Sequence, residues 1–174
     1  YAARTTGRTP DWAPLPVQYA DYALWQRDVL GSEDDPNSVG AKQLDYWKSA
    51  LADLPDQLAL PIDTPRPADQ SFRGDRIEFT VSAETHAALQ DLARTHNATV
   101  FMAVHAAFSV LLSRLSGMSD IAVGTPIAGR GEAVLDNLVG MFVNTLVFRL
   151  DVDGGRSFTE LLAATRETDL QAFA

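Results

Sequence analysis

One stretch decides how the chain folds, Gly140-Met141-Phe142-Val143-Asn144-Thr145-Leu146-Val147-Phe148-Arg149-Leu150. Successive side chains of an extended chain point to opposite faces, so the even-numbered residues share one face and the odd-numbered residues share the other. Both faces are largely apolar, which predicts an interior strand. Asn144 interrupts the even-numbered face, where a buried amide without partners would cost about 1 to 3 kcal/mol. Two hypotheses follow for Asn144, a core amide that ties a loop to the sheet or a site residue.

The composition excludes several classes of protein. A chain of 174 residues with 46% hydrophobic residues can bury a core, and its length fits one domain or a large part of one. A net charge of -9 argues against nucleic-acid binding, which needs clustered lysine and arginine. The lack of cysteine removes disulfides and thiol chemistry and is compatible with a cytoplasmic protein. No apolar run reaches the roughly 18 residues of a membrane helix, so no membrane partner is expected.

Apolar periodicity and turn residues predict the order of helices and strands. Alternating helices and strands favour a layered α/β fold with a mixed sheet. The helix from Thr99 to Ser116 is apolar on nearly every side, which predicts a central helix that ends at Gly117. The other expected elements are helices at Val17–Leu30, around Leu44, Trp47, Leu51 and Leu54, from Ser82 to near Asn97, and from Ser157 to Ala172; a half-buried strand at Arg76–Val81; a strand at Asp120–Ile127; a helical turn at Leu135–Val139; and an extended connector at Pro55–Gly74.

Side chains that could carry catalysis or bind a metal are sparse. His86, His96 and His105 fall on expected helices, outside any metal-ligand spacing, so each is interpreted as a surface or interhelical residue and no metal site is predicted. There is no G-x-S-x-G elbow, phosphate-binding glycine loop or H-E-x-x-H pair. Arg130 is expected to pair with an acidic neighbour.

Three stretches of the chain fit the motifs of one family. Val139–Thr145 followed by Arg149 fits V/I-G-x-F-V-N-T-x-x-x-R, and Tyr19–Gln26 fits Y-x-D-F/Y-A-x-W-Q. Leu60–Pro67 with the following Ser-x-x-Gly fits an L-P-x-D-x-P-R-P connector. In these motifs and their order the chain resembles the condensation domains of non-ribosomal peptide synthetases. The family's catalytic H-H-x-x-x-D-G is expected before Tyr1 and its H-Q-D-x-P-F-E after Ala174. We therefore expect the chain, which lacks an initiator methionine, to be a piece of a longer protein.

The resemblance implies a fold of two chloramphenicol-acetyltransferase-like lobes with the active site between them. Residues 1–70 would end the first lobe and form the crossover, and residues 71–174 would begin the second. Asn144, Arg149 and Gly140 become candidates for the active-site tunnel. Tyr19, Asp21 and Trp25 become structural motif residues. No catalytic residue is expected in the chain itself.

The implied reaction is amide-bond formation between carrier-protein-bound thioesters. Phosphopantetheine would arrive on donor and acceptor carrier proteins, and no cofactor would be held permanently. The chain alone is expected to be inactive, and to self-associate through apolar surface that the rest of the domain would cover. Two alternatives stay open, a coenzyme-A-dependent acyltransferase of the same superfamily and a non-catalytic interaction or structural module.

Overall fold

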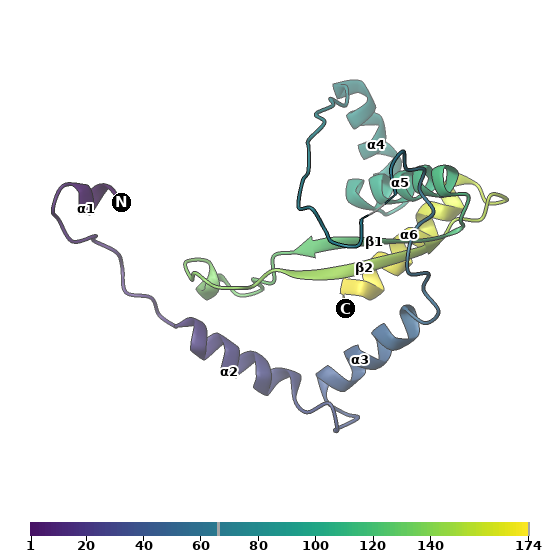
Figure 1. Ribbon diagram of the computed structural model, residues 1–174. Coiled ribbons are helices and arrows are strands. Elements are labelled where there is room, and N and C mark those ends of the chain that lie inside the picture. The colour runs from purple at the N-terminus through teal and green to yellow at the C-terminus, as the bar shows by residue number, and fades with distance from the viewer. Residues whose placement is uncertain (66, 174) are drawn as a thin grey trace. The chain divides into compact units, whose positions relative to one another are not determined.

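The computed structural model describes residues 1–65 and 67–173, and its secondary structure mixes helices with a small sheet. The α/β class predicted from the alternating pattern is confirmed. Figure 1 follows the elements along the chain from α1 to α6. Their bounds are α1 Ala2–Thr5, α2 Tyr19–Leu30, α3 Val39–Ala50, α4 Ala83–Thr95, α5 Val100–Ser116, β1 Asp120–Ile127, the short 3-10 helix η1 Ala133–Leu135, β2 Asn144–Asp151 and α6 Phe158–Phe173.

The described chain divides into two compact units. Unit 1 combines Tyr1–Ser49 with Pro126–Asn144, and unit 2 combines Ala50–Thr125 with Thr145–Ala174. Each unit has its own hydrophobic cluster, a small one around Phe142 in unit 1 and a larger one between α4, α5, α6 and the strands in unit 2. The two lobes expected at residues 1–70 and 71–174 concern a complete domain and stay a prediction.

Local capping signals placed most helix ends correctly. The side chains of Ser82 and Thr99 accept hydrogen bonds at 3.1 Å from the backbone N–H groups of Thr85 and Met102, so they cap α4 and α5, the helices predicted to begin at these residues. Gly117 ends α5 in the left-handed conformation with φ 71°. The helix predicted from Ser157 begins with a capping box, since the Glu160 carboxylate accepts a bond of 2.8 Å from the backbone N–H of Ser157.

The strand predicted at Arg76–Val81 is wrong for this chain. The segment has no regular secondary structure, no described segment pairs with it as a strand, and Ile77 and Phe79 are 90% and 85% exposed. An alternating pattern specifies which side chains share a face, whereas a strand also needs a neighbouring edge for its backbone hydrogen bonds. The described sheet contains β1 and β2 alone.

Three further expectations about individual elements need correction. The second predicted helix ends at Ala50, before Leu51 and Leu54. The strand of the opening stretch begins at Asn144, so Gly140–Val143 lies outside it. Helix α5 is not covered on all sides, because one face packs into the core while the opposite apolar face is exposed. Apolar composition indicates a preference for burial, but only neighbouring elements can supply the cover.

Within the described residues, no single helix is long and apolar enough to cross a membrane, and α4 and α5 meet that test only as a pair bent by 104°.

Candidate functional site

Two of the motif segments meet in unit 1, although they lie far apart in sequence. The hydroxyl of Tyr19 in α2 donates a 2.7 Å hydrogen bond to the carbonyl of Met141, 122 residues away. The Tyr19 ring meets the Phe142 ring edge to face, with centroids 5.4 Å apart. A Cβ atom on Gly140 would overlap the Tyr19 ring, so this close approach is what requires glycine. Gly140 is one of the candidates for the active-site tunnel; that role stays a prediction, and the structure shows this packing contact.

Arg130 fixes the loop before η1 against the same aromatic ring. Its guanidinium lies 3.8 Å from the centroid of Phe142 and donates to the carbonyls of Leu135 and Leu138, the latter at 2.9 Å. The acidic partner predicted for Arg130 is wrong as far as the described residues show, because backbone carbonyls take its N–H groups. Gly129 lies beside it with φ 61°, and a Cβ there would overlap the Phe142 carbonyl oxygen.

The other residues of the α2 motif shape the start of this helix and a hollow beside it. The Asp21 carboxylate accepts a 2.8 Å bond from the backbone N–H of Gln18 and so caps the helix. The Trp25 ring lies 6.0 Å from the ring of Tyr22, which is buried against Phe142. A mostly apolar hollow of about 370 Å³ lies there, lined by Val17, Asp21, Tyr22, Trp25, Glu132, Val134 and Leu135.

Arg149 is the most highly bonded candidate and belongs to unit 2. Its Nε and Nη2 atoms donate to both carboxylate oxygens of Asp120, at 2.9 and 2.8 Å, so β2 is tied to β1 by a bidentate pair. Its Nη1 donates to the carbonyls of Ala50 and Ala52 at 2.9 and 2.7 Å. Hydrogen bonding to Arg149 lowers the pKa of the Asp120 carboxyl, despite partial burial, which acts the other way. Within unit 2, Arg149 therefore clamps the backbone at Ala50 and Ala52 to the sheet.

Asn144 is the first residue of β2 and is exposed, whereas Leu146, Phe148 and Leu150 on the same face are buried. The expectation of a buried amide is therefore wrong for this chain. The alternation of β2 was predicted correctly, but the first buried residue of this strand is Leu146. The role of Asn144 in a tunnel stays a prediction.

The three histidines divide between the surface and the helix interface, as expected. His86 is exposed on α4, His96 caps the end of that helix, and His105 is buried between α5 and α6. The Nδ1 atom of His105 lies 3.0 Å from a carboxylate oxygen of Asp169 in α6. This pair was not predicted from the sequence. The only indication in the sequence was Asp169, an acidic residue at a position of α6 that shares its face with apolar residues. The described residues contain no group of three or more metal-ligating side chains.

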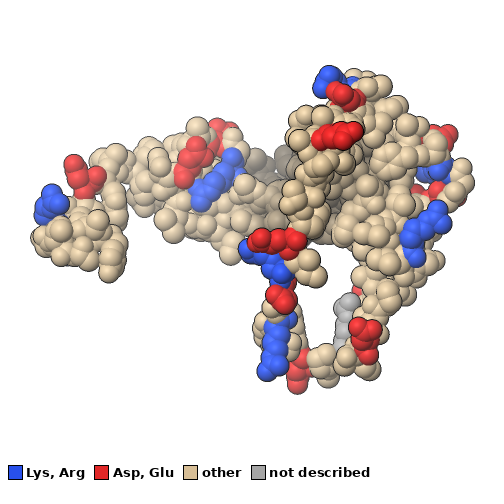
Figure 2. Space-filling view, turned by 90° about the horizontal axis from the view of Figure 1, so that it is seen from above, with Lys and Arg blue, Asp and Glu red and all other residues tan. Residues whose placement is uncertain are grey.

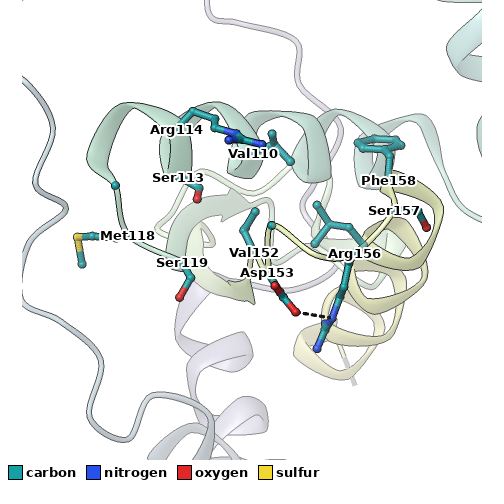
Figure 3. A pocket seen from close by; sticks show the side chains of 13 residues that line it. Val110, Ser113, Arg114, Met118, Ser119, Val152, Asp153, Arg156, Ser157 and Phe158 are labelled. Carbon is teal, nitrogen blue, oxygen red and sulfur yellow. Dashed lines mark ion pairs between the residues drawn. The ribbon is translucent and has the colours of Figure 1, made fainter.

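A hollow of about 530 Å³ in unit 2 lies where α5 ends and α6 begins (Figure 3). Arg114 reaches over it from α5, and Arg156 pairs with Asp153 at 4.0 Å below it. Hydroxyl groups of Ser113, Ser119 and Ser157 also line it, but its lining contains neither histidine nor cysteine. The arrangement shows no nucleophile activated by a base.

On the face drawn in Figure 2, lysine and arginine do not gather into a broad basic patch.

Comparisons with known proteins agree on one family. The family model described as Condensation domain matches residues 1–174. The chain is 54% identical over 173 residues to a dimodular nonribosomal peptide synthase of Bacillus subtilis, covering 99% of the chain and 7% of that protein. It is 53% identical over 173 residues to an isonitrile lipopeptide synthase of Mycobacterium tuberculosis, covering 99% of the chain and 7% of that protein.

Solved structures give the same result at the level of the fold. The X-domain from teicoplanin biosynthesis superposes with a TM-score of 0.88 at 31% identity, over 98% of this chain and 38% of that one. A four-domain nonribosomal peptide synthetase bound to AMP and glycine superposes with a TM-score of 0.79 at 32% identity, over 89% of this chain and 11% of that one. The chain thus spans a small part of the proteins that it matches.

Proposed function

The chain belongs to the condensation domain family, and from this premise we propose that it forms part of a site that joins carrier-protein-bound aminoacyl and peptidyl thioesters through an amide bond. In this reaction the amine of the acceptor attacks the thioester carbonyl carbon of the donor. A C–N bond forms, the C–S bond breaks, and the proton lost by the amine goes to the departing thiolate, which leaves as the free thiol. Phosphopantetheine would be delivered by the two carrier proteins, so it is carried as part of the substrate.

The observation that supports this proposal best is the contact between the two motif segments. Tyr19 touches both Gly140 and Phe142 and bonds the carbonyl of Met141, so motifs separated in sequence form one structure. This contact holds the segment that leads directly into Asn144. The proposed role of the chain is therefore to position a wall of the site. The general base or amine-positioning group would come from the H-H-x-x-x-D-G motif that the family resemblance implies.

The proposal predicts that this chain alone forms no amide. A complete domain that includes it should convert loaded donor and acceptor carrier proteins into a dipeptidyl thioester, whereas the chain alone should stay at the uncatalysed rate. No described side chain of the chain is assigned the proton-transfer or amine-positioning role. Product thioester can be followed by mass spectrometry of the carrier proteins. Turnover by the chain alone, or transfer from acyl-coenzyme A in place of a carrier protein, would contradict the proposal.

A second candidate function is protein recruitment without catalysis. One structural neighbour, at 31% identity and a TM-score of 0.89, is the X-domain in a complex with OxyB from teicoplanin biosynthesis. A complete domain that binds another protein of its assembly line but forms no amide in the same assay would favour this function.

Asn144→Ala in the complete domain should leave the melting temperature nearly unchanged and slow amide formation about tenfold or more. The side chain is exposed in this chain, and substitutions at exposed positions usually change stability by less than about 0.5 kcal/mol. If Asn144 helps to position the substrate, in contrast, its removal lowers the rate of amide formation directly. Val143→Ala, at the exposed neighbouring position, is the matched control. A melting loss that accounts for all of the lost activity would instead identify Asn144 as a core amide.

A further inference from the structure

A set of buried polar side chains runs between α5 and α6, and we call it the polar seam. It consists of His105 and Ser109 on α5 and Thr165 and Asp169 on α6, each at most 5% exposed. The two members on each helix are four residues apart, so they lie on the same face about one turn from each other. Figure 1 shows the two helices packed together beside the sheet. The seam thus follows the interface between the two helices.

The contacts within the seam are unusual for a hydrophobic interior. The Nδ1 atom of His105 lies 3.0 and 3.3 Å from the two carboxylate oxygens of Asp169, whose side chain is 0% exposed. Thr165 donates to the carbonyl of Leu161 within its own helix at 2.8 Å. The Nε2 atom of His105 and the hydroxyl of Ser109 are buried without a hydrogen-bond partner among the described residues. The His105–Asp169 pair is therefore the polar link that crosses between the helices.

A gain in net stability is not the physical role expected of this buried pair. Removing two ionisable groups from water is costly, and a well-packed apolar pair of similar volume is often as stable or more stable. A hydrogen-bonded pair differs in another respect, because it permits a narrow range of distances and directions. Apolar contacts between helices tolerate small shifts through changes of rotamer. The best-attested use of such a pair is to select one register of packing.

The seam also touches the strand that carries the motif. The ring of Phe148 in β2 is fully buried, and its centroid lies 5.3 Å from that of His105 and 5.6 Å from that of Phe173 in α6. Phe101 of α5 completes the enclosure at 5.8 Å. The next residue of β2 is Arg149, which clamps the strand to Asp120. A shift of α6 along α5 would therefore displace the residues that enclose Phe148.

We propose that the His105–Asp169 pair is a register lock, which fixes α6 against α5 and thereby holds β2 in the position needed for amide formation. His105 and Asp169 act as positioning residues, because both are buried away from any substrate. This inference rests on the proposed condensation function for its catalytic consequence. Its structural consequence, one fixed register of α6, does not depend on that function.

The test compares single and double apolar variants in the complete domain. His105→Leu and Asp169→Leu should each lower the melting temperature, since each leaves a buried partner unpaired. The double variant should recover a melting temperature close to that of the wild type, yet its kcat should stay about tenfold lower with little change in KM. His105→Asn, which keeps an N–H group near the position of Nδ1, should retain most of the activity. Arg114→Leu/Glu167→Leu changes exposed charges on the same helices and is the control.

Two outcomes would overturn the inference. Wild-type kcat in the double variant would show that the pair positions nothing, and a double variant as unstable as the single ones would make it an ordinary stabilising contact. If the wild-type domain itself forms no amide, the condensation function fails and hydrogen exchange decides the register lock. The double variant should then show about tenfold faster exchange of the α6 amides despite its recovered melting temperature. Unchanged exchange would overturn the lock.

Discussion

Arg149→Ala should lower the free energy of unfolding by about 2 to 3 kcal/mol, with the loss measured by urea titration. The substitution removes both donors from the Asp120 carboxylate and leaves the carbonyls of Ala50 and Ala52 without these N–H groups. Arg149 and Asp120 are 24% and 31% exposed, so water screens the pair and the loss stays below that of a fully buried one. Arg149→Lys keeps the charge without the planar fork and should lose an intermediate amount.

The Asp120 carboxyl gives this prediction a second measurement, the dependence of stability on pH. Arg149 lowers the pKa of Asp120 in the folded chain, so the pair contributes stability that is fully present above the unfolded pKa of about 3.9. That contribution is lost as the pH falls through the lower folded pKa. The difference in unfolding free energy between wild type and Arg149→Ala should therefore shrink below about pH 4.

Controls separate the clamp from ordinary surface charge. Arg94→Ala breaks an exposed ion pair with Asp91 within α4 and should change stability by less than about 1 kcal/mol. Equal unfolding free energies for wild type and Arg149→Ala at neutral pH would contradict the structural clamp. Arg149 would then stay a candidate for the mouth of the tunnel alone.

The features that sequence predicted well are those set by residues close together in the chain. Thr99 and Gly117 place the two ends of α5 because capping needs only the first or last turn of the helix. The capping box of Ser157 and Glu160 placed the start of α6 for the same reason. These signals do not depend on which other elements are present.

The features that sequence predicted poorly depend on partners far away in the chain. The alternation in Arg76–Val81 is real, but it does not supply a strand beside it. Asn144 lies on the predicted strand face, yet its exposure depends on what covers the beginning of β2. The contact between Tyr19 and Gly140 was not predicted by spacing, although both residues had been selected by their motifs. The pair of His105 and Asp169 required knowledge of how α5 and α6 pack.

The exposed face of helix α5 predicts that the isolated chain self-associates, which is the largest expected change in its oligomeric state. Five apolar side chains on its uncovered face are between 44% and 51% exposed. Their spacing alternates between three and four residues, which is the pattern of a helix seam that packs against another helix. Exposed apolar patches beyond a few hundred Å² are uncommon in monomeric proteins. This apolar stripe consists of Phe101, Val104, Phe108, Leu111 and Leu115.

We expect two copies of the isolated chain to pair through this stripe, because pairing removes the exposed apolar side chains of both copies from water. Light scattering coupled to size exclusion, across a concentration series, should give a mass above that of the 18.9 kDa monomer. Phe108→Glu/Leu115→Glu should return the chain to the monomer mass, since charges would be buried in the pair. Ala87→Glu/Gln90→Glu adds the same charges to exposed positions of α4 and should leave the association intact. A wild-type chain that remains monomeric, melts sharply and binds no hydrophobic dye would refute the prediction.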